Sequence, residues 1–196
     1  MPKEILSPEA LDALRKTHGA ICAIETPLGT AAFRCPTPEV YSRALAMQAN
    51  ETQAVHAARF LAVECVVHPA RAVFETWVAR RPGITKAADG PITRLAGMDQ
   101  EASAADADDG DTTTVTTSLG VATFKVPDET QWNKYRRMAS AKDPQAAVSW
   151  LALACVVVPE RTVFAEWIAQ RPGIAATVVP HIQRIAGVEE EERLKD

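Results

Sequence analysis

The chain has 196 residues, of which 47% are hydrophobic and 23% are charged, and its formal net charge is −4 at pH 7. This length allows one large domain or two small ones. The negative charge argues against general nucleic-acid binding, which needs clustered Lys and Arg to neutralise phosphates. No apolar run reaches the ~20 residues of a membrane-spanning helix, and no apolar signal segment opens the chain. We therefore expect a globular protein that acts in the cytoplasm.

The first predicted element is a leader helix over residues 7–17, because Ser7 is a natural N-cap and Pro8 suits the first helical position. Two short runs at 20–24 and 30–34 then flank Thr26-Pro27-Leu28-Gly29. This pattern predicts a β-hairpin, and we expect its glycine to supply a positive φ in the turn.

Apolar residues at helical spacing follow the hairpin. The helices expected in this half cover about 38–48, about 52–67, a segment that begins at Pro69 and ends at Arg81-Pro82-Gly83, and a last segment that ends at Gly97. Proline suits the first position of a helix, whereas glycine can cap its end. Because Asp89-Gly90-Pro91 lies inside the last segment, we expect that helix to be short or broken.

The second half of the chain repeats the first. Residues 65–97 and 155–187 are identical at 17 of 33 positions with a constant offset of 90, and residues 28–36 recur more faintly with an offset of 91. Internal periodicity is a stronger guide to architecture than length. The elements predicted for this half are strands at 113–117 and 121–126, helices at about 128–140 and 144–157, a helix from Pro159, and a segment that ends at Gly187.

Together these patterns predict an α+β, predominantly helical fold. It consists of two tandem repeats, each a β-hairpin followed by three to four short helices, plus the N-terminal leader helix. The predicted parts are the leader helix and first repeat module at 1–97, an acidic flexible linker at 98–112, the second module at 113–187 and a charged tail at 188–196. The linker assignment follows from its six acidic residues and absence of basic ones.

The sequence carries no recognisable catalytic motif. It lacks GxGxxG, P-loop, GxSxG and HExxH patterns, and none of its four histidines recurs in the other half. Cys65 and Cys155 each stand in an apolar run, and the two other cysteines, Cys22 and Cys35, complete no Cys-x-x-Cys pair. We predict buried free thiols, no catalytic, cofactor-binding or metal-binding residues, and no enzymatic activity.

Some of the duplicated residues are candidates for binding a partner. Arg71 and Arg161 follow the repeated proline by two residues, in a first helical turn where the helix dipole disfavours a cation. Each arginine is expected either to pair with a nearby carboxylate or helix-ending carbonyls, or to recognise an acidic partner. Two further arginines, Arg94 and Arg184, also correspond to each other.

The duplicated aromatic residues fall into two groups. Phe74 and Trp77, with Phe164 and Trp167 in the second half, lie on an apolar helical stripe and are predicted to form the module core. Tyr41 and Trp132 correspond at offset 91, just after the start of the helix that follows each hairpin. They either fix the hairpin to that helix or line a groove between the two, and the sequence leaves both readings open.

The order of these motifs resembles the small tail assembly chaperones of tailed bacteriophages and phage-like elements. The matching stretches of the first half are Leu14–Gly19, Phe33–Tyr41, Cys65–Pro69, Arg81–Gly83 and Ile92–Gly97. Those of the second half are Phe124–Pro127, Cys155–Pro159, Arg171–Gly173 and Ile182–Gly187. Members of this family usually carry one such module, so a tandem pair is a departure.

The resemblance implies a non-enzymatic protein that binds the long helical tape-measure protein and helps tail tube subunits assemble around it. It supplies no catalytic residues. The partner-binding candidates are Tyr41, Trp132, Arg71 and Arg161, and self-association into a homo-oligomer is left open. Two alternatives remain: a structural component of a phage particle or phage-like injection machine, and an enzyme with an unrecognised site. The enzyme alternative predicts a pocket with perturbed titratable groups in one module only.

Overall fold

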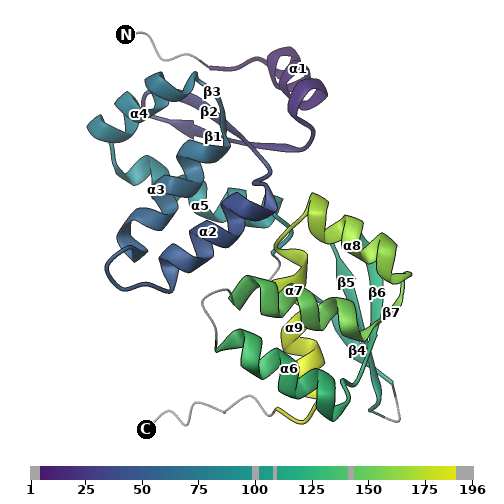
Figure 1. The fold of residues 1–196 in the computed structure, drawn as a ribbon. Helices are drawn as coiled ribbons and strands as arrows, with labels where there is room; N and C mark the ends of the chain where they lie inside the picture. Colours follow the sequence, from purple (N-terminus) through teal and green to yellow (C-terminus); the bar gives the residue numbers. More distant parts are fainter. Residues whose placement is uncertain (1–4, 99–101, 108–109, 141–143, 189–196) are drawn as a thin grey trace, which may run out of the picture. The chain divides into compact units, whose positions relative to one another are not determined.

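A computed structural model describes residues 5–98, 102–107, 110–140 and 144–188. The chain divides into two compact units (Figure 1): unit 1 is Met1–Met98 with Ala169–Gly173, and unit 2 is Asp99–Ile168 with Ile174–Asp196. Helices make up 58% of the described residues, and the strands form two small antiparallel sheets. The predicted α+β, predominantly helical class is therefore confirmed.

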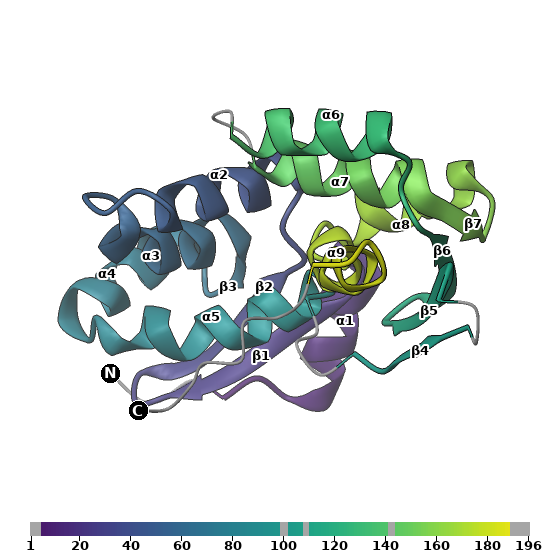
Figure 2. The ribbon, with the colours of Figure 1, turned by 90° about the horizontal axis from the view of Figure 1, so that it is seen from below.

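Unit 1 is built on an antiparallel sheet with the strand order β1-β2-β3. Its elements are α1 (Pro8–His18), β1 (Ile21–Thr26), β2 (Gly29–Arg34), α2 (Pro38–Gln48), α3 (Ala54–Cys65), β3 (Val66–His68), α4 (Arg71–Arg80) and α5 (Gly83–Leu95). Helices α3 and α5 pack against each other and on the sheet, and α2 packs on the other side of α3. Figure 2 shows α5 lying along β1 and β2. The α3–α5 layer and the sheet enclose the core.

Unit 2 is built on an antiparallel sheet with the strand order β4-β5-β6-β7. Its elements are β4 (Ala104–Asp106), β5 (Thr112–Thr117), β6 (Gly120–Lys125), α6 (Glu129–Ala139), α7 (Pro144–Cys155), β7 (Val156–Val158), α8 (Arg161–Gln170) and α9 (Ile174–Ile185). Helix α9 packs on β5 and on α7, and α6 packs on α7. From β5 onward the element order is the same as that from β1 onward in unit 1.

An aromatic pair stands at the centre of each core. In unit 1, Phe33 and Phe74 are both 0% exposed, with ring centroids 5.5 Å apart in an edge-to-face arrangement. In unit 2, Phe124 and Phe164 are also 0% exposed, with centroids 5.3 Å apart. Edge-to-face packing is favourable because the positive ring edge meets the negative ring face. The predicted core role of the two helix phenylalanines is confirmed.

The hairpin turns follow the predicted chemistry and add a threonine that the sequence reading overlooked. Gly29 and Gly120 both have a φ of +146°, a conformation that L side chains rarely adopt, as expected from the repeated Leu-Gly pair. The Thr26 hydroxyl donates to the Gly29 carbonyl at 2.7 Å and accepts from the Leu28 amide at 3.1 Å. Thr117 makes the corresponding bonds in unit 2. Each turn is therefore closed by its own side chain.

The predicted helix starts are largely confirmed by their caps. The Ser7 hydroxyl accepts from the Ala10 amide, and Pro8 is the first residue of α1. Thr37 caps α2 in the same way, and Asp128 caps α6 in a reciprocal pair with Gln131. These caps satisfy amides that a helix N-terminus otherwise leaves unpaired.

Two short strands replace the ends of predicted helices. The helices expected at 52–67 and 144–157 end at Cys65 and Cys155, and the valine-rich residues that follow form β3 and β7. These strands pair with β2 and β6, because β-branched residues beside an open sheet edge gain more from pairing than from one further helical turn. Pro69 and Pro159 were wrongly predicted as first helical residues, since α4 and α8 begin at Arg71 and Arg161.

The prediction of a short or broken last helix in unit 1 is wrong. Helix α5 runs unbroken through Gly90 and Pro91. Its buried face includes Ile84, Ala88 and Ile92, and this apolar packing outweighs the local cost of proline and glycine. The Arg81-Pro82-Gly83 corner also differs from expectation, because Gly83 begins α5 and does not cap α4.

The acidic segment at 98–112, predicted as a flexible linker, contains secondary structure. Its residues Ala104–Asp106 form β4, which pairs antiparallel with β5. Composition indicated a solvated linker, but three extended residues beside an available edge form backbone hydrogen bonds whatever their composition. Most of the predicted charged tail, residues 189–196, lies outside the described residues.

Candidate functional site

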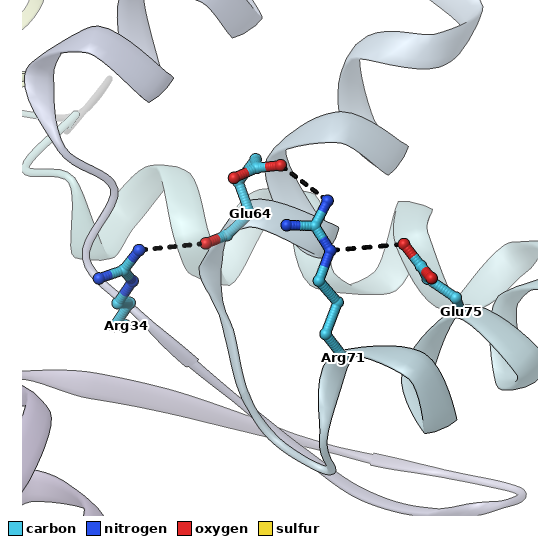
Figure 3. A network of polar contacts seen from close by, with 4 residues as sticks. All are labelled: Arg34, Glu64, Arg71 and Glu75. Carbon is cyan, nitrogen blue, oxygen red and sulfur yellow. Dashed lines mark hydrogen bonds and ion pairs between the residues drawn. The ribbon is translucent and has the colours of Figure 1, made fainter.

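Arg71 is the centre of a polar network in unit 1 (Figure 3). Its Nη2 lies 2.9 Å from Glu64 Oε1 of α3, and its Nε lies 3.4 Å from Glu75 Oε1 one turn along α4. Arg34 of β2 donates to the Glu64 backbone carbonyl at 3.5 Å. Hydrogen bonding to Glu64 is the main reason why the pKa of Arg71 is raised. The predicted pairing of this arginine with a nearby carboxylate is confirmed.

The same network borders an open groove with a volume of about 280 Å³. The residues that line it are Met47, His56, Arg59, Phe60, Val63, Glu64, Arg71 and Glu75. Apolar side chains from α2 and α3 therefore lie beside charged ones from α3 and α4. Because Arg71 is already held by two carboxylates, the groove of unit 1 offers no uncompensated cation at this position.

Arg161, the counterpart of Arg71, has a different environment. Glu64 and Glu75 correspond to Ala154 and Ala165 in the second half. Arg161 is exposed, and within the described residues it forms no ion pair. The predicted pairing of Arg161 with a carboxylate is therefore not observed within the described residues.

The remaining positions of the unit 1 groove also change in unit 2. His56 and Arg59 correspond to Ala146 and Ser149, so two basic side chains are replaced by small ones. The apolar positions are kept as Met138, Trp150 and Leu153, all partly exposed. We call Met138, Trp150, Leu153, Ala154, Arg161 and Ala165 the Arg161 face. It combines partly exposed apolar side chains with Arg161 and with Lys134, which lies over the Trp150 ring.

A cation over an aromatic ring is common to both units and was not foreseen from the sequence. Arg43 of α2 lies 4.8 Å from the ring centroid of Phe60 on α3, and Lys134 of α6 lies 4.6 Å from that of Trp150 on α7. Such contacts stabilise the packing of two helices through the ring quadrupole. The signal was available, because both residue pairs correspond across the two halves.

Tyr41 and Trp132 are placed differently by the structure. Tyr41 is only 2% exposed, and its hydroxyl donates to Met98 Sδ at 3.4 Å. Burial raises its pKa to about 12. Its side chain is therefore packed inside the protein, in line with the reading in which it fixes neighbouring elements, and offers no surface to a partner.

Trp132 lies partly exposed at the edge of the unit 2 core. Its ring centroid is 5.5 Å from that of Tyr135, one turn along α6, and it packs against the buried core cluster. Of the four predicted partner-binding residues, Trp132 and the two arginines thus remain accessible.

The described cysteines are free thiols. Cys65 and Cys155 are buried as predicted, whereas Cys22 and Cys35 are only partly buried. Burial raises the pKa of Cys65 to about 12 and that of Cys155 to about 11. These two thiols therefore stay protonated at neutral pH, the form that is weakly nucleophilic.

Within the described ranges, no group of three or more His, Cys, Asp or Glu side chains is placed to hold a metal ion. In the same part of the chain, no helix is both long and apolar enough to cross a membrane. The candidate site is therefore described by the surroundings of Arg71 and Arg161 and by the apolar residues near them.

Comparison of the chain with protein-family models, characterised proteins and solved structures found no match.

Proposed function

We propose that this chain is a non-enzymatic tail assembly chaperone of the phage type, which binds a helical tape-measure-like protein and assists tail tube assembly. We infer further that its two units are tandem copies of one binding module. The repeated motifs and the shared element order support the second inference. The observation that carries the first is the Arg161 face, with its partly exposed apolar residues and a cation that has no carboxylate among the described residues.

An amphipathic helix is the partner that this face would suit. A helix presents apolar side chains at i, i+3, i+4 and i+7, which can cover Trp150 and Leu153. A carboxylate at the border of that stripe would replace the two glutamates that unit 2 lacks beside Arg161. A second contact through unit 1 would then be favoured by effective concentration, because the two modules belong to one chain.

Co-expression with a tape-measure protein from the same source tests the proposal. We expect the tape-measure protein to become soluble and to elute with this chain from a sizing column. Arg161→Glu should reduce the recovered complex at least tenfold, because it places an anion where a carboxylate is to bind. The matched variant Arg71→Glu should leave most of the complex, since Arg71 is already compensated. A tape-measure protein whose solubility does not change, with no complex eluting, would overturn the proposal.

The alternative function is a structural component retained in a phage particle or phage-like injection machine. The resemblance in motif order applies equally to a protein that remains bound to its partner. Mass spectrometry of purified particles separates the two functions. A chaperone is expected to be absent from finished particles, whereas stoichiometric recovery of this chain would favour the structural role.

A further inference from the structure

The outer edge of β5 in unit 2 is covered by a strand. Ala104, Ala105 and Asp106 of β4 pair antiparallel with Val115, Thr114 and Thr113. Backbone hydrogen bonds extend this pairing at both ends, from the Thr116 amide to the Ser103 carbonyl at 3.0 Å and from the Ala107 amide to the Thr112 carbonyl at 2.9 Å. A segment of only a few residues is therefore enough to occupy this edge.

Two side chains of the added strand are recognised by the rest of unit 2. Ala104 packs against the buried core cluster beside Val115. The Asp106 carboxylate forms an ion pair with Arg184 of α9 through both of its oxygens, with 2.8 Å between Nη2 and Oδ1. The pattern that fits the edge is thus a small apolar residue followed two positions later by a carboxylate.

The corresponding edge in unit 1 has no strand partner among the described residues. β1 is the terminal strand of its sheet, and no described strand pairs with its outer side. Burial reflects this difference, since Thr113 and Val115 are 0% exposed whereas their counterparts Cys22 and Ile24 are only partly buried. In the register that β4 uses, the amide and carbonyl of Ala23 face outward, as those of Thr114 do.

The cation that recognises the carboxylate is also present in unit 1. Arg94 of α5 corresponds to Arg184 and is exposed. Helix α5, which carries Arg94, packs on β1, and the Arg94 guanidinium opposes the rise in the pKa of the Cys22 thiol that burial causes. Among the residues that the structure describes, Arg94 has no ion-pair partner.

We propose that the outer edge of β1 is a docking site for an extended acidic segment of a protein partner, which adds an antiparallel strand and places a carboxylate on Arg94. This mode is β-augmentation, in which backbone hydrogen bonds supply affinity and alternate side chains supply specificity. The segment carries a small apolar residue beside Ile24 and, two positions later, Asp or Glu beside Cys22. A second copy of this chain is a poorer occupant, because its own Ala104–Asp106 already pairs with its own β5.

This inference does not rest on the proposed function. It concerns a strand edge and an extended peptide, whereas the proposed function concerns the Arg161 face and a helix. The experiment below contains no helical partner, so its failure and the failure of the co-expression test are separate results.

The test is a titration of the full chain, labelled with ¹⁵N, with the blocked peptide Ala-Ser-Ala-Ala-Asp-Ala, which copies residues 102–107. In unit 2 the tethered β4 competes with this peptide at high effective concentration. The added peptide is therefore expected to shift the amide signals of Ile21–Thr26 in a saturable way, and to leave those of Thr112–Thr117 unchanged.

Two variants and one altered peptide provide the controls. Arg94→Gln and the peptide with Asn in place of Asp should each weaken binding by roughly two- to fivefold, and their effects should not add, because they remove the same exposed ion pair. Ala23→Pro should abolish the shifts, since proline lacks the outward amide yet is tolerated on an edge strand. Ala23→Val keeps that amide and should still bind.

The outcomes that overturn the proposal are distinct. Shifts that are absent from Ile21–Thr26, or equal in wild type and in Ala23→Pro, show that the β1 edge does not bind the strand. A concentration-dependent dimer that Ala23→Pro abolishes shows that a second copy is the occupant. If Ala23→Pro disturbs folding of unit 1, the test relies on the Arg94→Gln variant and the Asn peptide. Losses of binding affinity that add, or that are absent, overturn the proposal.

Discussion

Arg71 in unit 1 and Arg161 in unit 2 occupy corresponding positions but have opposite surroundings. Arg71 contacts two glutamates, while Arg161 faces alanine at both corresponding positions and has no ion pair within the described residues. The strand edges differ in the opposite sense, because β4 pairs with β5 whereas no described strand pairs with the outer side of β1. Each unit therefore pairs internally one group whose counterpart in the other unit has no such partner within the described residues, although corresponding residues build the two cores.

The largest losses of stability should come from substitutions in the two cores. We expect these losses to be equal in the two units, because the core residues correspond. Phe33→Ala and Phe124→Ala should each destabilise their own unit by about 3–5 kcal/mol, because each ring is fully buried in an aromatic pair. Chemical denaturation followed by tryptophan fluorescence separates the units, since Trp77 is the only tryptophan of unit 1. Unequal losses would show that one core depends on surroundings that the other lacks.

The hairpin turn of unit 2 is expected to tolerate no side chain at its glycine without a loss of stability. Gly120→Ala should destabilise the protein by about 2–3 kcal/mol, because the residue has a φ of +146° and an added Cβ would lie 2.9 Å from Trp167. Gly29→Ala tests the same conformation in unit 1, since its φ is the same. Thermal unfolding measures the stability of both variants. A loss for Gly120→Ala that is smaller than expected would mean that the Trp167 indole moves aside.

The parts of the fold that could be read from the sequence are those with local causes. Ser7 and Thr37 cap their helices, the Leu-Gly turns need positive φ, and the repeated phenylalanines fill the cores. The parts that could not be read depend on non-local pairing. β3 and β7 look helical by spacing, and β4 looks like a linker by composition, yet each forms beside an edge that only the folded sheet provides.

The candidate site likewise has features that could be predicted from the sequence and others that depend on contacts between distant residues. The arginine pair was identifiable because it is duplicated, and the loss of both glutamates in the second half could have been read from the alignment of the two halves. Burial of Tyr41 was not readable, because its contact with Met98 joins residues 57 positions apart. Likewise, nothing local indicated that Asp106 would meet Arg184.

The buried thiols predict a fall in stability at high pH that is common to both units. The pKa of Cys65 is about 12 and that of Cys155 about 11 in the folded chain, compared with roughly 8.5 when unfolded. The unfolded state therefore loses its thiol proton first, so the stabilisation is complete below about pH 8.5 and is lost as pH rises towards the folded pKa. In that window, each thiol should lower the free energy of unfolding by about 1.4 kcal/mol per pH unit. Urea denaturation between pH 8 and 10 measures the slope, which Cys65→Ala and Cys155→Ala should each reduce.

The smallest effect on stability should come from exchanging the two arginine environments. Ala154→Glu with Ala165→Glu gives Arg161 the two carboxylates that Arg71 has, and exposed ion pairs of this kind change the thermal midpoint little. Partner binding should weaken far more, because the added glutamates would pair with Arg161 in place of a partner's carboxylate. Pull-down of the tape-measure protein measures this, with Glu64→Ala and Glu75→Ala together as the reciprocal exchange in unit 1. Undiminished binding by the unit 2 exchange would mean that Arg161, although exposed, is not part of the contact, and that the difference between the units lies in the strand edges alone.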